Sequence, residues 1–182
     1  MKELSLNILD ITENSTTAKA NLVFITITET DETLELCISD NGKGMTKEFL
    51  SDVTNPFTTT RTTRKVGLGI PLLKLQAQQT GGDVEITSKY FEDYPDSHGT
   101  TTKALFYKNH IDMTPLGDVI STITTLIQGH DEVDFVFTHT MPDKEVMLDT
   151  RQMREILGDV KLSTPEVLVF ITEYLKDQYG QE

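Results

Sequence analysis

The chain has 182 residues, enough for one domain or one domain with an appendage, and its 37% hydrophobic content is ordinary for a soluble globular protein. Its net charge of −13 argues against a nucleic-acid-binding groove, which needs a basic surface. No apolar run approaches the roughly 20 residues of a membrane span, and residues 1–4 lack the apolar core of a signal peptide. We therefore expect a cytoplasmic protein without nucleic-acid or membrane partners. The single cysteine, Cys37, agrees with a reducing compartment.

The charge is unevenly distributed. Residues 1–108 carry 11 basic and 15 acidic side chains, whereas residues 109–182 carry 5 and 14. No acid occurs from residue 53 to residue 82, where the basic residues are Arg61, Arg64, Lys65 and Lys74. Such a stretch suits a small bound polyanion, although a solvated charged loop has the same composition.

The first elements follow from hydrophobic periodicity. Apolar residues at helical spacing predict a helix over residues 3–18. Alternation of apolar and polar residues predicts a β-hairpin with strands at 22–29 and 33–39. Another face of the first helix is expected to be polar, and it carries Asn7, Asp10 and Asn14.

The remaining elements divide at a change of composition near residue 108. Before it we predict, in order, a helix at 46–52 capped by Thr46, a polar loop at 53–66, a helix at 69–80 and strands at 83–90 and 100–107. After it we predict a helix at 114–128, a hairpin at 133–140 and 144–149, and helices at 150–157 and 164–179. We therefore expect a domain over residues 1–108 and a small α+β C-terminal extension over residues 109–182. This acidic extension could bind a partner, form a dimer interface or complete the fold.

The segment Asp40-Asn41-Gly42-Lys43-Gly44-Met45 has the residue types of a nucleotide pocket. A carboxylate at the end of a strand, Asp40, can accept a hydrogen bond from an exocyclic amine such as the adenine N6. Gly42 and Gly44 would let the backbone approach the base closely. The segment taken alone is equally compatible with a tight turn.

Other residues suit phosphates and a metal ion. Gly67 and Gly69 precede a helix, whose free N–H groups bind phosphate oxygens, and Lys65 lies beside them. Mg²⁺ takes few protein oxygens when phosphates complete its shell, so the Asn14 amide can serve as one ligand. Asp10, one turn away, can orient or deprotonate an attacking water or hydroxyl. A solvated helix face is the alternative explanation for this pair.

Taken in order, these motifs resemble the Bergerat-fold ATP-binding module of gyrase, heat-shock chaperone, histidine kinase and mismatch-repair ATPases, often called GHKL. The resemblance covers roughly residues 3–107. The matching segments are Asp10–Ala18, Asp40–Gly44, Gly67-Leu68-Gly69-Ile70, Gly81–Ile86 with Ser88, and Gly99-Thr100-Thr101. Pro56-Phe57-Thr58-Thr59 resembles the lid of nitrogen-type sensor kinases and anti-sigma serine kinases.

The resemblance implies a two-layer α/β sandwich with a mixed sheet, with ATP between helices and sheet and a lid at 53–66. It implies that Asn14 binds Mg²⁺, that Met45 lies against the base, and that Asp40 and a threonine at 100–101 contact adenine. The expected cofactor-binding residues are Asn14, Asp40, Gly42, Gly44, Met45, Lys65, Gly67, Leu68, Gly69 and Thr101. Asp10 is the expected catalytic residue, in place of the Glu of the hydrolysing members of the family.

The use of ATP stays open between three functions. The favoured one is a stand-alone regulatory protein that hydrolyses ATP slowly and switches an interface with its nucleotide state. The others are a serine/threonine kinase of the anti-sigma type and a non-catalytic ATP sensor. Because the module begins at residue 3, we expect no phosphoacceptor hairpin before it, and hence not a complete sensor histidine kinase. A regulatory protein partner is expected but not identified, and a homodimer is possible.

Overall fold

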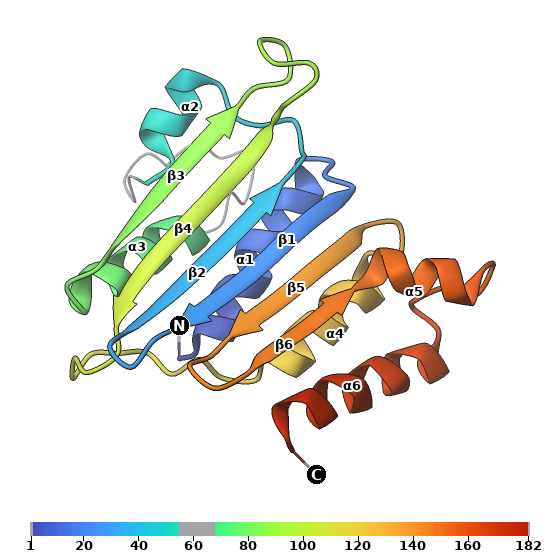
Figure 1. The fold of residues 1–182 in the computed structure, drawn as a ribbon. Helices are drawn as coiled ribbons and strands as arrows, with labels where there is room; N and C mark the ends of the chain where they lie inside the picture. Colours follow the sequence, from blue (N-terminus) through green and yellow to red (C-terminus); the bar gives the residue numbers. More distant parts are fainter. Residues whose placement is uncertain (1, 55–67, 182) are drawn as a thin grey trace.

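The computed structural model describes residues 2–54 and 68–181. The predicted lid at 53–66 falls almost entirely outside the described residues. Six strands form a single sheet, in the order β3-β4-β2-β1-β5-β6 (Figure 1). The strands are β1 (Leu22–Glu29), β2 (Thr33–Asp40), β3 (Asp83–Lys89), β4 (Gly99–Tyr107), β5 (Asp134–Thr140) and β6 (Glu145–Asp149).

The sheet is mixed, as predicted. β1 pairs with β2 in an antiparallel hairpin on one side and with β5 in parallel on the other, from Leu22–Asp134 to Thr28–Thr140. The other neighbouring pairs are antiparallel. Residues from both sides of the predicted boundary at residue 108 therefore belong to the same sheet. The parallel pairing needs a crossover, which the chain makes through α4 (Val119–Gly129).

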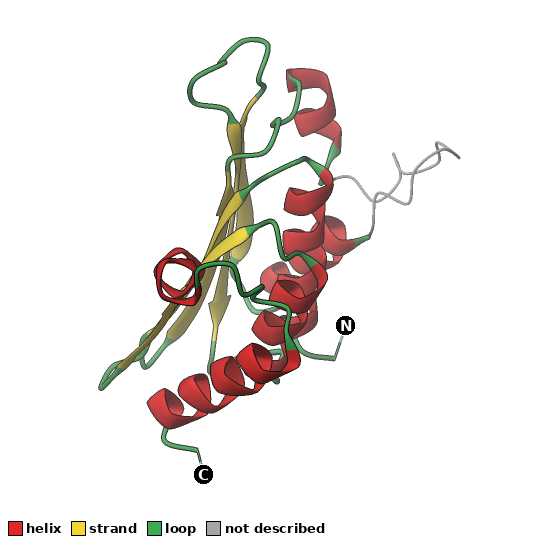
Figure 2. Cartoon of the chain, turned by 90° about the vertical axis from the view of Figure 1, so that its right-hand side faces the viewer, coloured by secondary structure: helices red, strands yellow, loops and turns green. Residues whose placement is uncertain are grey.

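Most of the helices cover one face of the sheet (Figure 2). Besides α4, the helices are α1 (Leu4–Thr17), α2 (Lys47–Asp52), α3 (Gly69–Gln79), α5 (Thr150–Leu157) and α6 (Pro165–Tyr179). Figure 2 shows α5 end on, at the opposite face. In agreement, the Arg151 guanidinium of α5 lies 5.9 Å from the ring centre of Phe24, which points to that face. The result is the α/β fold with a mixed sheet that the sequence predicts.

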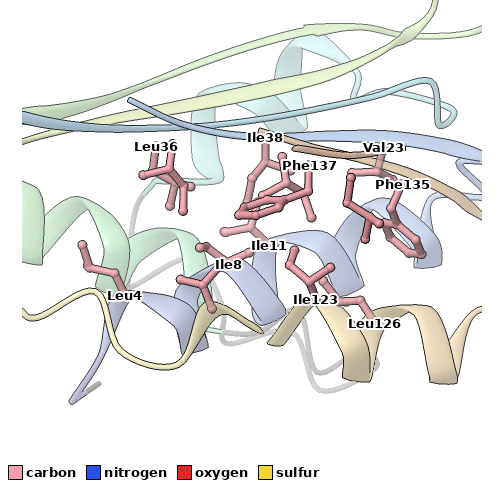
Figure 3. Close-up of a cluster of buried hydrophobic side chains, with 14 of the residues drawn as sticks. Leu4, Ile8, Ile11, Val23, Leu36, Ile38, Ile123, Leu126, Phe135 and Phe137 are labelled. Carbon is pink, nitrogen blue, oxygen red and sulfur yellow. The ribbon is translucent and has the colours of Figure 1, made fainter. Parts of the chain in front are cut away.

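The core lies between the sheet and this helical layer (Figure 3). It combines α1 and α4 with the inner faces of β1, β2 and β5, and the alternation at 22–29 and 33–39 predicts the inner faces of β1 and β2. The residues labelled in Figure 3 are Leu4, Ile8, Ile11, Val23, Leu36, Ile38, Ile123, Leu126, Phe135 and Phe137. All are at most 3% exposed, and burying a side chain of this size stabilises the fold by roughly 1.5–3 kcal/mol.

One predicted helix is shorter than expected: 114–128 begins only at Val119. Gly117 has φ +79°, outside the helical region, and Asp118 caps the helix by accepting a hydrogen bond from Ser121 N at 2.9 Å. The preceding carbonyls of Pro115 and Leu116 accept from the first N–H groups of α1. This segment therefore supplies hydrogen-bond acceptors to the free N–H groups at the start of α1 instead of extending α4.

None of the helices within residues 2–54 and 68–181 combines the length and apolar character that crossing a bilayer requires.

Candidate nucleotide-binding site

A cavity of about 370 Å³ opens between α1, α2 and the ends of β2 and β4. Its size lies within the usual range for small-molecule pockets. Four of the predicted residues line it: Asn14, Asp40, Gly44 and Met45. The remaining lining residues are Ile11, Ser15, Thr17, Ala18, Ile38, Lys43, Thr46, Phe49, Val53, Ile70, Tyr90, Thr100 and Thr102.

Asp40 is held in a defined orientation at the end of β2. Ser15 Oγ donates to Asp40 Oδ2 at 2.6 Å, and the backbone N–H of Gly42 donates to Asp40 Oδ1 at 2.8 Å. Each carboxylate oxygen can accept a further hydrogen bond. A carboxylate fixed in this way at the cavity wall suits an amine donor on a planar base.

The two glycines after Asp40 serve packing more than the sequence suggests. A Cβ at Gly42 would lie 2.9 Å from the carbonyl oxygen of Ala18, and Gly42 is not among the lining residues. A Cβ at Gly44 would lie 1.9 Å from the carbonyl oxygen of Lys89, and its φ of +70° favours glycine. At both positions the structure shows close approach of neighbouring backbone. The approach of these glycines to a base stays a prediction, and of the two Gly44 lines the cavity.

The loop that follows Asp40 is anchored on three sides. The N–H of Lys43 donates to Ala18 O, and the N–H of Phe91 donates to Lys43 O, both at 2.9 Å. Met45 N donates to Ser88 Oγ at 2.8 Å. His98 Nδ1 donates to Gly42 O at 2.5 Å, so this histidine, which no motif singles out, supports the cavity wall.

Thr101, the threonine expected at adenine, faces away from the cavity. Its hydroxyl lies 2.8 Å from that of Ser39, its cross-strand partner on the opposite face. Because side chains alternate along a strand, Thr100 and Thr102 instead face the cavity, opposite Asp40 and Ile38 in the register. The correction is a shift by one residue within the predicted Gly-Thr-Thr segment.

Asp10 lies beside the cavity, against the start of α3. A Cβ at Gly69 would lie 3.2 Å from the Cβ of Asp10, a tight contact, so glycine favours a helix start this close to the carboxylate. Burial, and secondarily the Glu13 carboxylate, raise the pKa of Asp10 above its ordinary value of 3.8. Leu68 occupies the N-cap position of α3 and is largely exposed. The predicted glycine-led helix start is thus next to Asp10.

The polar face of α1 is not simply solvated. Asn7, predicted on the same face as Asp10 and Asn14, is fully buried and donates from Nδ2 to Gln76 Oε1 of α3 at 2.9 Å. This face therefore packs against α3 at one end and reaches the cavity through Asn14 at the other.

Two predicted residues, Lys65 and Gly67, lie outside the described residues. Within residues 2–54 and 68–181, no group of three or more His, Cys, Asp or Glu side chains could hold a metal ion. A metal at Asn14 would therefore take most of its oxygen ligands from phosphates and water, which is the coordination that Mg²⁺ accepts. The donor set fits Mg²⁺ bound together with a nucleotide.

The cavity residues that the motifs did not single out as functional include Ser15, Phe49 and Tyr90. Ser15 lies inside the first motif, but its bond to Asp40, 25 positions away, depends on the tertiary fold. Phe49 and Tyr90 add apolar and aromatic surface from α2 and the end of β3. No sequence signal distinguishes these two from ordinary aromatic residues.

Two solved structures share the fold of this chain over most of its length. The N-terminal domain of a DNA repair protein superposes with a TM-score of 0.54 and 16% identity, covering 82% of this chain and 53% of that one. The chain thus spans about half the length of that structure. The Aquifex aeolicus MutL ATPase domain complexed with ADP superposes with a TM-score of 0.53 and 14% identity, covering 100% of this chain and 70% of that one. At these identities the likeness concerns the fold.

The sequence comparison is more specific. A search of curated proteins found no match. The sequence model of the histidine kinase-, DNA gyrase B- and HSP90-like ATPases matches residues 1–110, more than half of the 182 residues. This range includes each of the motifs quoted above and the described cavity. The chain therefore belongs to the family of histidine kinase-, DNA gyrase B- and HSP90-like ATPases and has the ATP-binding domain of that family.

Proposed function

We propose that this chain is a regulatory protein that binds Mg²⁺ and ATP, hydrolyses ATP slowly and changes its interaction with a protein partner according to the bound nucleotide. The observation that carries the proposal is the Asp40 carboxylate, fixed at the cavity wall by Ser15 and the N–H of Gly42. An anchored acceptor of this kind selects a base with an exocyclic amine at that edge, as adenine has at N6, where guanine has a carbonyl oxygen. The family match supports the same assignment.

The adenine end of the cavity is assigned to the surroundings of Asp40. Thr100 and Thr102 place hydroxyl groups on the same wall, and Met45 and Ile38 supply apolar surface for the faces of the base. Polar groups at the edge and apolar groups at the faces match the two kinds of surface that a purine presents.

The phosphate end is assigned to Asn14 and the start of α3. Asn14 offers an amide oxygen to Mg²⁺, which when bound neutralises phosphate charge and leaves the phosphorus open to attack. The N-terminus of α3 presents N–H groups and the positive end of the helix dipole. Both lie next to Asp10 in the fold, since Asp10 is one turn from Asn14 and packs against Gly69.

Asp10 is proposed to take the proton from the attacking water. Burial raises its pKa, which makes the carboxylate a stronger base than an exposed aspartate. An aspartate is one methylene shorter than a glutamate, so it reaches the water less readily. This difference supports slow turnover.

The test is Asp10→Asn, with Glu13→Gln as the matched control. Glu13 is an acid on the same helix whose carboxylate bonds to His130. It is only the smaller of the two causes of the raised pKa of Asp10, so Glu13→Gln should change turnover far less than Asp10→Asn. ATP affinity by calorimetry should stay unchanged in both variants. Steady-state phosphate release should fall about 10²–10⁴-fold in Asp10→Asn only.

The same measurements distinguish the other two functions. An unmutated protein that binds ATP but releases no phosphate, with or without protein partners, would be a sensor. Transfer of the γ-phosphate to a serine or threonine of an added protein would make the chain a kinase. Turnover by Asp10→Asn at the unmutated rate would remove Asp10 from the chemistry.

A further inference from the structure

The outward side of α6 carries apolar and acidic side chains in one stripe. We call it the outer face of α6, and it consists of Glu166, Val169, Phe170, Glu173, Tyr174 and Asp177. Val169 and Phe170 are each 57% exposed and Tyr174 is 43% exposed. The rings of Phe170 and Tyr174 are stacked, with centroids 6.1 Å apart and planes 18° apart. These aromatic rings already contact each other, so together they offer one ordered apolar surface to solvent.

The inner side of α6 is fully engaged with the rest of the fold. Val167, Ile171 and Leu175 are buried in the core. The side-chain amide of Gln178 accepts from Met147 N and donates to Met147 O, both at 2.9 Å. It thus provides hydrogen-bond partners for these backbone groups of β6. The helix is therefore held rigidly in place, and its outer face has no part in holding it.

Charge decides what this face can bind. Glu166, Glu173 and Asp177 are exposed along the stripe, with Lys176 as a basic residue at its margin. The segment from 109 to 182 carries 14 acidic and 5 basic residues. The field over the face is therefore negative, which repels nucleic acid and anionic lipid.

A second copy of the chain is also disfavoured at this face. In a twofold dimer the same surface lies on both subunits, so the acidic stripe of one copy would face the acidic stripe of the other. Like charges placed opposite one another oppose association. A partner with basic residues around an apolar strip meets both properties of the face.

We propose that the outer face of α6 binds a basic amphipathic helix of a partner protein. Apolar side chains of that helix would pack on Val169, Phe170 and Tyr174, and its lysines or arginines would pair with the carboxylates. The site is separate from the nucleotide cavity, to which α6 contributes no lining residue. The inference therefore goes beyond the proposed function and does not depend on it.

The test uses the full chain and a labelled helical peptide of about five turns, with leucine on one face and lysine flanking it. Two comparison peptides replace the lysines by glutamate or the leucines by alanine. Fluorescence anisotropy should show saturable binding of the first peptide only. The double substitution Phe170→Ala with Tyr174→Ala, and separately Glu173→Lys, should each weaken binding at least about tenfold.

Matched controls come from α5, where Ile156 is 86% exposed and Glu155 is a neighbouring exposed acid. Ile156→Ala and Glu155→Lys should leave peptide binding unchanged, and every variant should keep its ATP affinity. No saturable binding by the leucine-lysine peptide would overturn the proposal, as would equal loss in the α5 variants. If the peptide with alanine in place of leucine bound equally well, charge alone would explain the binding, and the proposal would be overturned as well. Self-association that Phe170→Ala with Tyr174→Ala abolishes would assign the face to a second copy.

Discussion

The nucleotide cavity depends on a few side chains whose roles come from their hydrogen bonds. Asp40 is oriented by one hydroxyl and one backbone N–H, and its cross-strand partner Thr100 shares the cavity wall. Asn14 and Asp10 lie one turn apart on α1, with Asn14 in the cavity and Asp10 against Gly69. Single substitutions at these positions separate base recognition from metal binding.

Asp40→Ala should weaken ATP binding by roughly 1–3 kcal/mol, because the exocyclic amine would lose its half-buried acceptor. Ser15→Ala should have a smaller effect, about 0.5–1.5 kcal/mol, because Asp40 keeps its bond from Gly42 N. Calorimetry with ATP and GTP measures both. Equal affinity of the unmutated protein for the two nucleotides would contradict this role for Asp40.

Asn14→Ala should abolish the dependence of ATP affinity on Mg²⁺ without unfolding the chain. Asn14 is half-buried at the cavity wall, so the substitution removes the amide at the edge of the cavity. Magnesium titrations of nucleotide binding, with circular dichroism as the folding control, measure this. An Asn14→Ala protein whose ATP affinity still responds normally to Mg²⁺ would exclude Asn14 as a ligand.

At the scale of elements, a buried polar network joins β1, β5 and the end of α6. His139 is 2% exposed, with Nε2 2.9 Å from Glu29 Oε1 and Nδ1 2.7 Å from Tyr179 Oη. Because a carboxylate only accepts, Nε2 carries the proton and Nδ1 accepts from the tyrosine. Glu29 also forms a 2.7 Å ion pair with Lys108. The network thus connects the N-terminal and C-terminal segments of the chain.

This network should make stability depend on pH. Burial lowers the pKa of His139 below 6.5 despite the opposing Glu29. Burial alone would raise the pKa of Glu29, but hydrogen bonds from Lys108 and His139 bring it below 4.5. In both cases the unfolded chain binds protons more readily than the folded chain. Stability should therefore fall as the pH drops below about 6.5, and further below about 4.5.

Urea unfolding at several pH values measures this effect. His139→Gln should flatten the profile between about pH 7 and 5, because the unfolded chain no longer gains that proton. The control is His110→Gln. His110 is exposed, and its Nδ1 lies 3.6 Å from the Asp112 carboxylate. A profile for His139→Gln as steep as that of the unmutated protein would assign the pH dependence to other groups.

At the scale of the whole molecule, residues 109–182 are continuous with the nucleotide-binding part. β5 pairs with β1 in the middle of the sheet, and Ile123 and Leu126 of α4 pack in the same core as Ile8 and Ile11 of α1. The matched family region ends at residue 110, before α4 and β5. The cavity residues therefore lie in one segment, while part of the core that supports them comes from the other.

A chain that ends at residue 110 tests this division. It retains every described cavity residue, so if it folds it should bind ATP. However, it exposes the β1 edge and the apolar side of α1, so it should unfold at lower urea than the full chain or aggregate. Urea unfolding and light scattering measure the two outcomes. A soluble truncation as stable as the full chain would show that residues 109–182 are dispensable for the fold.

The sequence by itself determined the element types and the order of the motifs. Alternation in 22–29 and 33–39 predicted β1 and β2, and helical spacing predicted α1, because the period of burial is a local property. Asn14 and Asp40 could be proposed for the cavity for a similar reason. Their residue types and positions within short motifs imply the chemistry of a nucleotide site.

Only the tertiary structure decided which side chains meet. The choice between Thr100 and Thr101 depends on strand register, where a shift of one residue moves a side chain to the other face. The contact of Gly42 with Ala18 and the bond from Ser15 to Asp40 each involve residues far apart in the chain. The parallel pairing of β1 with β5 is equally non-local. Such contacts form only when the whole sheet and its helices pack together, so no local pattern encodes them.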